Sequence, residues 1–333
     1  MRRKPTSQRG FTLVEMMIAL LLFSFAMAGV LSVAVTMASG FHEQRQAIAI
    51  ETSVRGPMDY LSDAVRLASP SVPSGLIQDS VAPCNIGAIV VTDSVTGPDK
   101  LDVTYATGTS IASITGVGGW TAGNSFEILN DSVPSQASQI FIGDTLLVSN
   151  FAQGTLVHVT GIGVAGAVAT ITFTLAGCVT FPAGGYPVGS LVIRVLRAQF
   201  SVGLVDLIPT LMMDPDGPDG PLGPEPLAEG IEDMQIALGV DLSGNDEIED
   251  PAEWLYSKLT PGPNPVGVQT PIRAVRITLV SRTSDVLVAG TTAGVGVVSA
   301  LPAAEDRPAG PLDAYRRRVL TSTVEVRNLV GSP

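Results

Sequence analysis

The sequence predicts an α+β protein in which one long amino-terminal helix carries a β-rich globular head. Between Phe11 and Phe41 the only formal charge is Glu15, so this segment is long and apolar enough to form a transmembrane helix. From about residue 74 onward, short apolar runs show the two-residue alternation of half-buried strands. The 35 Gly and 24 Pro residues and a charged fraction of only 15% also suit a loop-rich β protein.

The charge balance excludes some classes of protein. The chain has 19 Lys+Arg against 31 Asp+Glu, which gives a formal net charge of −12 at pH 7. Nucleic-acid-binding proteins normally present a basic face, so no nucleic-acid partner is predicted from charge. A hydrophobic fraction of 45% argues against an intrinsically disordered chain.

Composition divides the chain into three parts. Residues 1–10 form a basic leader without an acidic residue, which predicts a cytoplasmic amino terminus for the membrane helix that follows. Residues 11–68 are predicted to be the amino-terminal helix, with an apolar transmembrane half at 11–41. The Gly56-Pro57 pair predicts a kink or a break near 56–57. Residues 74–333 are predicted to form the head.

The head is predicted to consist mainly of strands. Residues 209–228 and 241–270 are rich in Pro, Gly and acidic residues, and they are predicted to be acidic loops. Residues 228–239 are compatible with a strand or with a short helix. Strands are predicted at 86–92, 101–105, 126–129, 139–150, 155–160, 168–175, 191–202, 272–281 and 319–326.

The amino terminus carries a specific short motif. A basic leader ends in Arg9-Gly10, Phe11-Thr12-Leu13-Val14 follows, and Glu15 lies four residues after Phe11 at the start of the apolar helix. This order resembles the type IV prepilin family. The resemblance implies cleavage between Gly10 and Phe11 by a prepilin peptidase, and N-methylation of Phe11. It also implies that the apolar helix first anchors the subunit in the membrane and later packs in the core of a filament.

Glu15 is the candidate residue for setting the register of assembly. A carboxylate within an apolar membrane helix costs a few kcal/mol unless it is paired, so such a residue is a functional candidate by default. The prepilin resemblance implies that Glu15 meets the positive amino terminus of a neighbouring subunit. The alternative is that Glu15 lies near the membrane interface and extends its side chain to water.

The order of segments in the head resembles the PilW-type minor pilin family. The segments that carry this resemblance are residues 143–148, 229–241, 272–280 and 316–319. It implies a pilin-like head and a minor pilin, not an enzyme, that primes or takes part in type IV pilus assembly. The implied partners are other minor and major pilins, the prepilin peptidase and the inner-membrane assembly platform. The implied location is the inner membrane, with a single pass and a periplasmic head, and then the pilus filament at the cell surface.

Two other functions share parts of this pattern. A pseudopilin of a type II secretion system carries the same amino-terminal motif. A membrane-tethered adhesin or enzyme would use the pilin stem only as a carrier for its head.

The two cysteines and the acidic residues leave two further questions open. Cys84 and Cys178 either form a disulfide in an oxidising compartment or remain buried thiols. A candidate calcium loop places oxygen ligands at alternate positions, as an EF-hand does, but it lacks the usual Gly at the sixth position. A solvated acidic turn is the alternative, and no other cofactor is predicted. The loop residues are Asp241, Ser243, Asn245, Glu247 and Glu249.

No catalytic motif is found. Residues 161–166 match GxGxxG, but a strand-like run follows them instead of a helix, which predicts a Gly-rich hairpin and not a dinucleotide site. His42 and His158 are far apart in the sequence and have no obvious ligand pattern around them.

Overall fold

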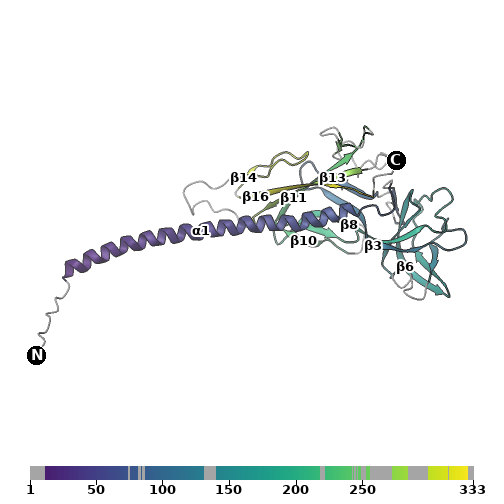
Figure 1. Cartoon of the computed structure of the whole chain (residues 1–333), viewed down its shortest axis with the longest axis horizontal. Helices are drawn as coiled ribbons and strands as arrows, with labels where there is room; N and C mark the ends of the chain where they lie inside the picture. The colour runs from purple at the N-terminus through teal and green to yellow at the C-terminus, as the bar shows by residue number, and fades with distance from the viewer. Residues whose placement is uncertain are drawn as a thin grey trace, which may run out of the picture.

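A long helix gives the molecule its length (Figure 1). In the computed structural model, α1 spans Leu13–Arg66, 54 residues, which corresponds to about 81 Å at 1.5 Å per residue. The strand-rich head packs against its carboxyl-terminal part, so the predicted fold class is confirmed. The structure describes residues 12–73, 76–81, 84, 87–130, 140–217, 222–241, 243, 245, 247–248, 253–255, 272–283, 299–313 and 315–328.

The helix continues through Gly56 and Pro57. Pro57 lies inside α1, where it has no N–H to donate to the preceding turn. Burial of the next turn offsets this loss, because Met58 and Leu61 are almost completely buried against the head. The structure therefore has one continuous helix here, so the predicted break is wrong, and the kink at this position stays a prediction.

The two halves of α1 have different surroundings. The side chains of Leu13–Ala38 are exposed on every side of the helix. In the second half, buried residues recur every three or four positions and form one apolar stripe. The main members of this stripe are Ile50, Val54, Met58, Leu61 and Val65.

The larger sheet of the head has ten strands within the described residues. β8 lies at its centre and pairs antiparallel with β3 along one edge and with β5 and β9 along the other. The path through the sheet is β10-β9-β8-β5-β6-β7-β4, with β1 beside β6 and β2 beside β3. The bounds are β1 Ile77–Asp79, β2 Ile89–Thr92, β3 Lys100–Ser113, β4 Ser125–Leu129, β5 Thr145–Ser149, β6 Gly154–Ala165, β7 Val168–Phe173, β8 Leu191–Val205, β9 Ile208–Asp214 and β10 Glu225–Glu229.

A second sheet lies against α1. Its order is β12-β11-β13-β16, and all of its described pairings are antiparallel. A short two-stranded ribbon joins β14 to β15. The bounds are β11 Ile231–Val240, β12 Trp254–Leu255, β13 Ile272–Arg282, β14 Ser299–Ala300, β15 Leu312–Asp313 and β16 Arg317–Glu325.

Two clusters of buried side chains form the interior of the head. The first, the joint core, lies between α1 and the strands β3, β8, β11, β13 and β16. The second, the distal core, is built from β4 to β7 and the loops around them. Trp120 and Tyr186 stack there with ring centroids 5.3 Å apart, and Phe173 meets the Trp120 ring edge-on. β6 lies at the end of the molecule opposite the amino terminus (Figure 1).

The acidic region at 209–228 corrects one prediction. It was predicted to be a loop, but β9 enters it and β10 lies within it, paired with each other in a register interrupted by a bulge after Pro226. The Pro and Gly residues conceal these strands in the sequence, because Pro is tolerated at strand starts, edges and bulges. Residues 228–239 contribute to strand β11, not a helix. The predicted hairpin at 161–166 is confirmed by the antiparallel pairing of β6 with β7.

Candidate assembly site

α1 begins with a reciprocal cap between Thr12 and Glu15. The Thr12 backbone N–H and hydroxyl each donate to Glu15 Oε2 at 2.9 Å, and the Glu15 N–H donates to Thr12 Oγ1 at 3.3 Å. The carboxylate is therefore held over the first turn, where the helix dipole favours a negative charge. Gly10 and Phe11, the predicted processing site, lie outside the described residues.

This cap explains how an apolar helix tolerates an acid at its start. Two donors from Thr12 reduce the cost of removing the Glu15 carboxylate from water. They also fix the carboxylate at the exposed end of the helix. The capping role of Thr12 was not predicted, although the Thr-x-x-Glu spacing before an apolar run is a recognised signal.

The helix that follows is suited to a membrane. Residues Leu13–Ala38 form a 26-residue apolar segment of which 0% is buried inside the protein. At 1.5 Å per residue this segment is about 39 Å long, enough for a hydrocarbon core of about 30 Å. By length and composition, the amino-terminal segment fits that of a membrane-anchored protein.

The second half of α1 is fixed to the head. Ser281 Oγ donates to the Ile50 carbonyl at 3.4 Å, and Asn328 Nδ2 donates to the Ala68 carbonyl at 2.9 Å. These polar contacts bracket the apolar stripe at its two ends. The second half of α1 is therefore held to the head by polar as well as apolar contacts.

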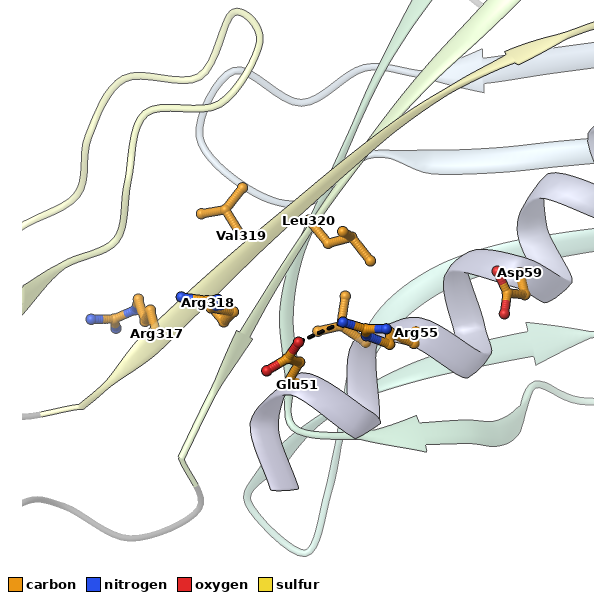
Figure 2. Close-up of a pocket in the computed structure, with 8 residues that line it drawn as sticks. Glu51, Arg55, Asp59, Arg317, Arg318, Val319 and Leu320 are labelled. Atoms are coloured by element: carbon orange, nitrogen blue, oxygen red, sulfur yellow. Dashed lines mark hydrogen bonds and ion pairs between the residues drawn. The ribbon is translucent and has the colours of Figure 1, made fainter. Parts of the chain in front are cut away.

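A groove lies between α1 and β16, where the helix first meets the head (Figure 2). It has a volume of about 610 Å³. On the helix side, Arg55 is paired with Glu51 at 2.6 Å. The lining residues are Glu51, Val54, Arg55, Asp59, Arg317, Arg318, Val319 and Leu320.

The arginines at the start of β16 differ in their surroundings. The Arg317 side chain is only 5% exposed and donates to Glu232 at 3.0 Å and to Asp313 at 2.6 Å. Its hydrogen bonds lower the pKa of the Asp313 carboxyl. Arg316 and Arg318 have no ion pair within the part of the chain that the structure describes. The sequence does not reveal this difference, because it depends on strands distant in the chain.

Cys84 and Cys178 form a disulfide in the structure. It joins the segment after β1 to the segment after β7. Nearby backbone bonds support the same contact, since the Asp79 N–H donates to the Cys84 carbonyl at 2.7 Å and the Ala176 N–H to the Ser80 carbonyl at 2.6 Å.

In the candidate calcium loop, the first carboxylate, Asp241, already has partners within the protein. Asp241 Oδ1 accepts from the Asn245 N–H at 3.2 Å and from the Ser243 hydroxyl at 3.4 Å, and Oδ2 lies 3.5 Å from Arg273. Glu249 lies outside the described residues. Among the described residues, no group of three or more His, Cys, Asp or Glu is arranged to hold a metal ion. Calcium binding stays a prediction.

Of the two histidines, the structure describes the side chain of His158. His158 lies between Asp79 and Thr145, with Nε2 at 2.9 Å from Asp79 Oδ1 and Nδ1 at 3.1 Å from Thr145 Oγ1. The backbone of His42 lies in α1, and its side chain lies outside the described part.

Comparisons with known proteins bear on the same two regions. Residues 198–328 match the family model described as Type IV pilus-assembly protein W, and residues 5–31 match the prokaryotic N-terminal methylation motif. No curated protein matches the chain. A solved structure of a type IV-like pilin from Thermus thermophilus is 12% identical, with coverage of 73% of this chain and 85% of that chain and a TM-score of 0.30. Together, the motif and the head match support a type IV minor pilin of the PilW type.

Proposed function

We propose that this PilW-type pilin primes or takes part in the assembly of a type IV pilus, together with other minor and major pilins. The observation that carries the proposal is the form of α1. Its exposed apolar half begins at the Thr12–Glu15 cap, and the same helix continues into the joint core of the head. Because both halves belong to one continuous helix, the apolar half enters a filament together with the head.

Processing precedes assembly in this proposal. A prepilin peptidase hydrolyses the Gly10–Phe11 peptide bond at the cytoplasmic side, and the new amino group of Phe11 is methylated. The Glu15 carboxylate then pairs with the positive amino terminus of a neighbouring subunit. Opposite charges in an apolar environment offset the cost of burying both, which sets the axial register.

The subunit starts in the inner membrane, with a cytoplasmic leader and a periplasmic head. The disulfide between Cys84 and Cys178 supports a head in an oxidising compartment. Removal of the leader, which contains four cations, changes the formal net charge from −12 to −16. This charge keeps the exported head soluble. In the filament, close packing between helices replaces contacts with lipid.

A deletion strain tests the proposal. Cells without this protein are expected to have few or no pili by electron microscopy, and the wild-type gene is expected to restore them. Glu15→Ala is expected to reach the membrane in normal amount but to be depleted from sheared pili. Asp63→Ala is the matched control, because Asp63 is an exposed acid of the same helix outside the apolar half.

Two results contradict the proposal. One is a normal number of pili in the deletion strain together with absence of the protein from them. The other is a protein in pili that still begins at residue 1 by mass spectrometry. Loss of protein secretion without loss of pili would instead identify a type II secretion pseudopilin.

A second candidate function is adhesion by the head. It is favoured by the distal core, which is separate from the joint core, lies away from the apolar helix and falls outside both matched regions. The test compares pili from wild-type and Trp120→Ala strains for binding to host cells and to surfaces. Equal binding at equal piliation argues against adhesion.

A further inference from the structure

Among the described strands, only β13 pairs with β16, on one side, so β16 is an edge strand of its sheet. It pairs with β13 in a regular register without a bulge, from Arg282 opposite Arg317 to Ala274 opposite Glu325. The bonds at both ends, from Thr283 N–H to the Arg316 carbonyl and from Val326 N–H to the Arg273 carbonyl, fix which residues exchange hydrogen bonds. The even-numbered residues of β16 bond to β13. The odd-numbered residues direct their N–H and C=O groups outward, where no described strand pairs with them.

The sequence of this edge does not discourage pairing. Residues 319–324 read Val-Leu-Thr-Ser-Thr-Val, with no Pro, no Gly and no charge. Edge strands in soluble proteins are usually blunted by charges, Pro or bulges, because an open edge invites another strand. Nine residues of regular, β-prone edge are long enough to pair with a strand of ordinary length.

The space beside this edge is open and partly charged. The groove of about 610 Å³ described above runs along it, and a smaller recess of about 290 Å³ extends it to Ile50 and Arg316. Figure 2 shows Arg318, Val319 and Leu320 along β16 with Glu51 and Arg55 across from them on α1. Arg55 is already paired with Glu51. Among the described lining residues, Arg316, Arg318 and Asp59 have no ion pair. The two arginines lie together at the start of β16, so this end of the groove favours an anionic group.

We propose that β16 accepts an extended strand from a neighbouring pilin subunit, and that a carboxylate of this strand pairs with Arg318. Main-chain hydrogen bonds to the odd-numbered residues supply the affinity, and the arginine supplies the register. The neighbour is another pilin because the groove flanks α1. In a filament built on packed helices, adjacent subunits meet beside this helix. The inference rests on the proposed function and adds the contact through which the subunit joins its neighbour.

Site-directed photo-crosslinking tests the contact in the full-length protein. Replacement of Val319 with p-benzoylphenylalanine places the crosslinker on the open edge, where the valine is 43% exposed. The matched control is the same replacement of Val188, which is 57% exposed and lies beside the distal core. Irradiated cells are expected to give an adduct at position 319 with an extended, acidic peptide of a second pilin, identified by mass spectrometry. The control at 188 is expected to give no such adduct.

A proline on the open edge tests the hydrogen bonds themselves. Thr321→Pro removes an N–H that the fold does not use, whereas Thr321→Ala removes only the side chain. The proline is expected to lower the yield of the adduct at position 319 by about tenfold, the factor that corresponds to about 1.4 kcal/mol, with the alanine variant near wild type. Arg318→Glu is expected to lower the yield of this adduct by a similar factor, and Arg318→Lys is expected to lower it by much less. Unchanged melting temperatures show that the variants fold.

The outcomes separate this inference from the proposed function. If Thr321→Pro folds and gives the wild-type adduct and the wild-type level in pili, strand addition is wrong and the pilin function stands. An adduct with lipid, or within the same chain, also overturns strand addition. If the wild-type protein itself is absent from pili, the proposed function fails first. Should Thr321→Pro not fold, Thr323→Pro and the Arg318 pair of variants give the same decision.

Discussion

At the scale of single residues, the start of α1 depends on two side chains that hold each other. Thr12 supplies two donors to one oxygen of Glu15. We expect Thr12→Ala to weaken the helix start by about 1 kcal/mol and to lower incorporation into pili less than Glu15→Ala does. Immunoblots of sheared pili, normalised to the membrane level, measure this. Thr36→Ala, in the same apolar half, is the control. Wild-type incorporation of both Thr12→Ala and Glu15→Ala would refute the role of the cap.

Asp99 makes the stability of the head depend on pH. It is 1% exposed, and burial raises its pKa to about 7, although the N–H groups of Ser94 and Ile236 favour the charged form. In the unfolded chain the same carboxyl ionises near pH 3.9. Between these two pKa values the unfolded state has already lost the proton, so stability falls as the pH rises toward 7 and levels off above it.

The expected result is a higher melting temperature at about pH 5 than at about pH 7.5 for the detergent-solubilised protein. Asp99→Asn should remove much of this dependence of the melting temperature on pH. Asp59→Asn, at an exposed position, should leave it unchanged. Burial also raises the pKa of Asp233, so a part of the slope remains in the variant. A variant at Asp99 with the full wild-type slope would show that another group is responsible.

At the scale of elements, the disulfide ties together segments that lie 94 positions apart. Changing Cys84 and Cys178 to Ser together is expected to lower the free energy of unfolding by roughly 2–4 kcal/mol, because the unfolded chain gains freedom. Denaturant unfolding of the solubilised protein measures this difference. Reduction of the wild-type protein should give the same loss. Equal midpoints for the oxidised wild type and the double variant would contradict the prediction.

The loop that begins at Asp241 provides a test for calcium. If this loop binds the ion, addition of Ca²⁺ raises the melting temperature by mass action, because the folded state alone presents the site. Calcium must then compete with Arg273, which lies 3.5 Å from the Asp241 carboxylate. Asp241→Asn should abolish the shift, and Asp216→Asn, in the other acidic loop, should not. If added Ca²⁺ gives no heat of binding in calorimetry and no shift in melting temperature, this segment is a solvated acidic turn and not a calcium site.

The sequence predicted the strands in which buried and exposed residues alternate along the strand itself. β4 has the alternation exposed–buried–exposed–buried–exposed, and the predicted strand at 126–129 matches it closely. β9 and β10 were missed, because turn-forming residues lie within and around two strands that are stabilised by pairing with each other. The Thr12–Glu15 cap was also readable from its spacing. The sequence left open whether Cys84 and Cys178 pair, and it did not predict the groove between α1 and β16. Both depend on contacts between distant segments.

At the scale of the whole molecule, function is distributed along its length (Figure 1). The apolar half of α1 lies at one end, the joint core follows, and the distal core lies at the other end. The two cores share strands β3, β5, β6 and β8 but have different neighbours. α1 contributes side chains only to the joint core among the described buried residues. Damage to the distal core should therefore leave the connection between helix and head intact.

A pair of cavity-forming substitutions tests this separation. Leu61 is 0% exposed in the joint core and Trp120 is 1% exposed in the distal core. Leu61→Ala is expected to cost about 2–5 kcal/mol and Trp120→Ala about 3–5 kcal/mol. If the cores are separate, Trp120→Ala exposes protease sites only in the distal part and still enters pili, whereas Leu61→Ala loosens the helix and is depleted from pili. Leu67→Ala, at a 49% exposed leucine of the same region, should behave as wild type. Identical protease patterns for the two core variants would mean that the head unfolds as one unit, and that the distal part cannot vary independently of assembly.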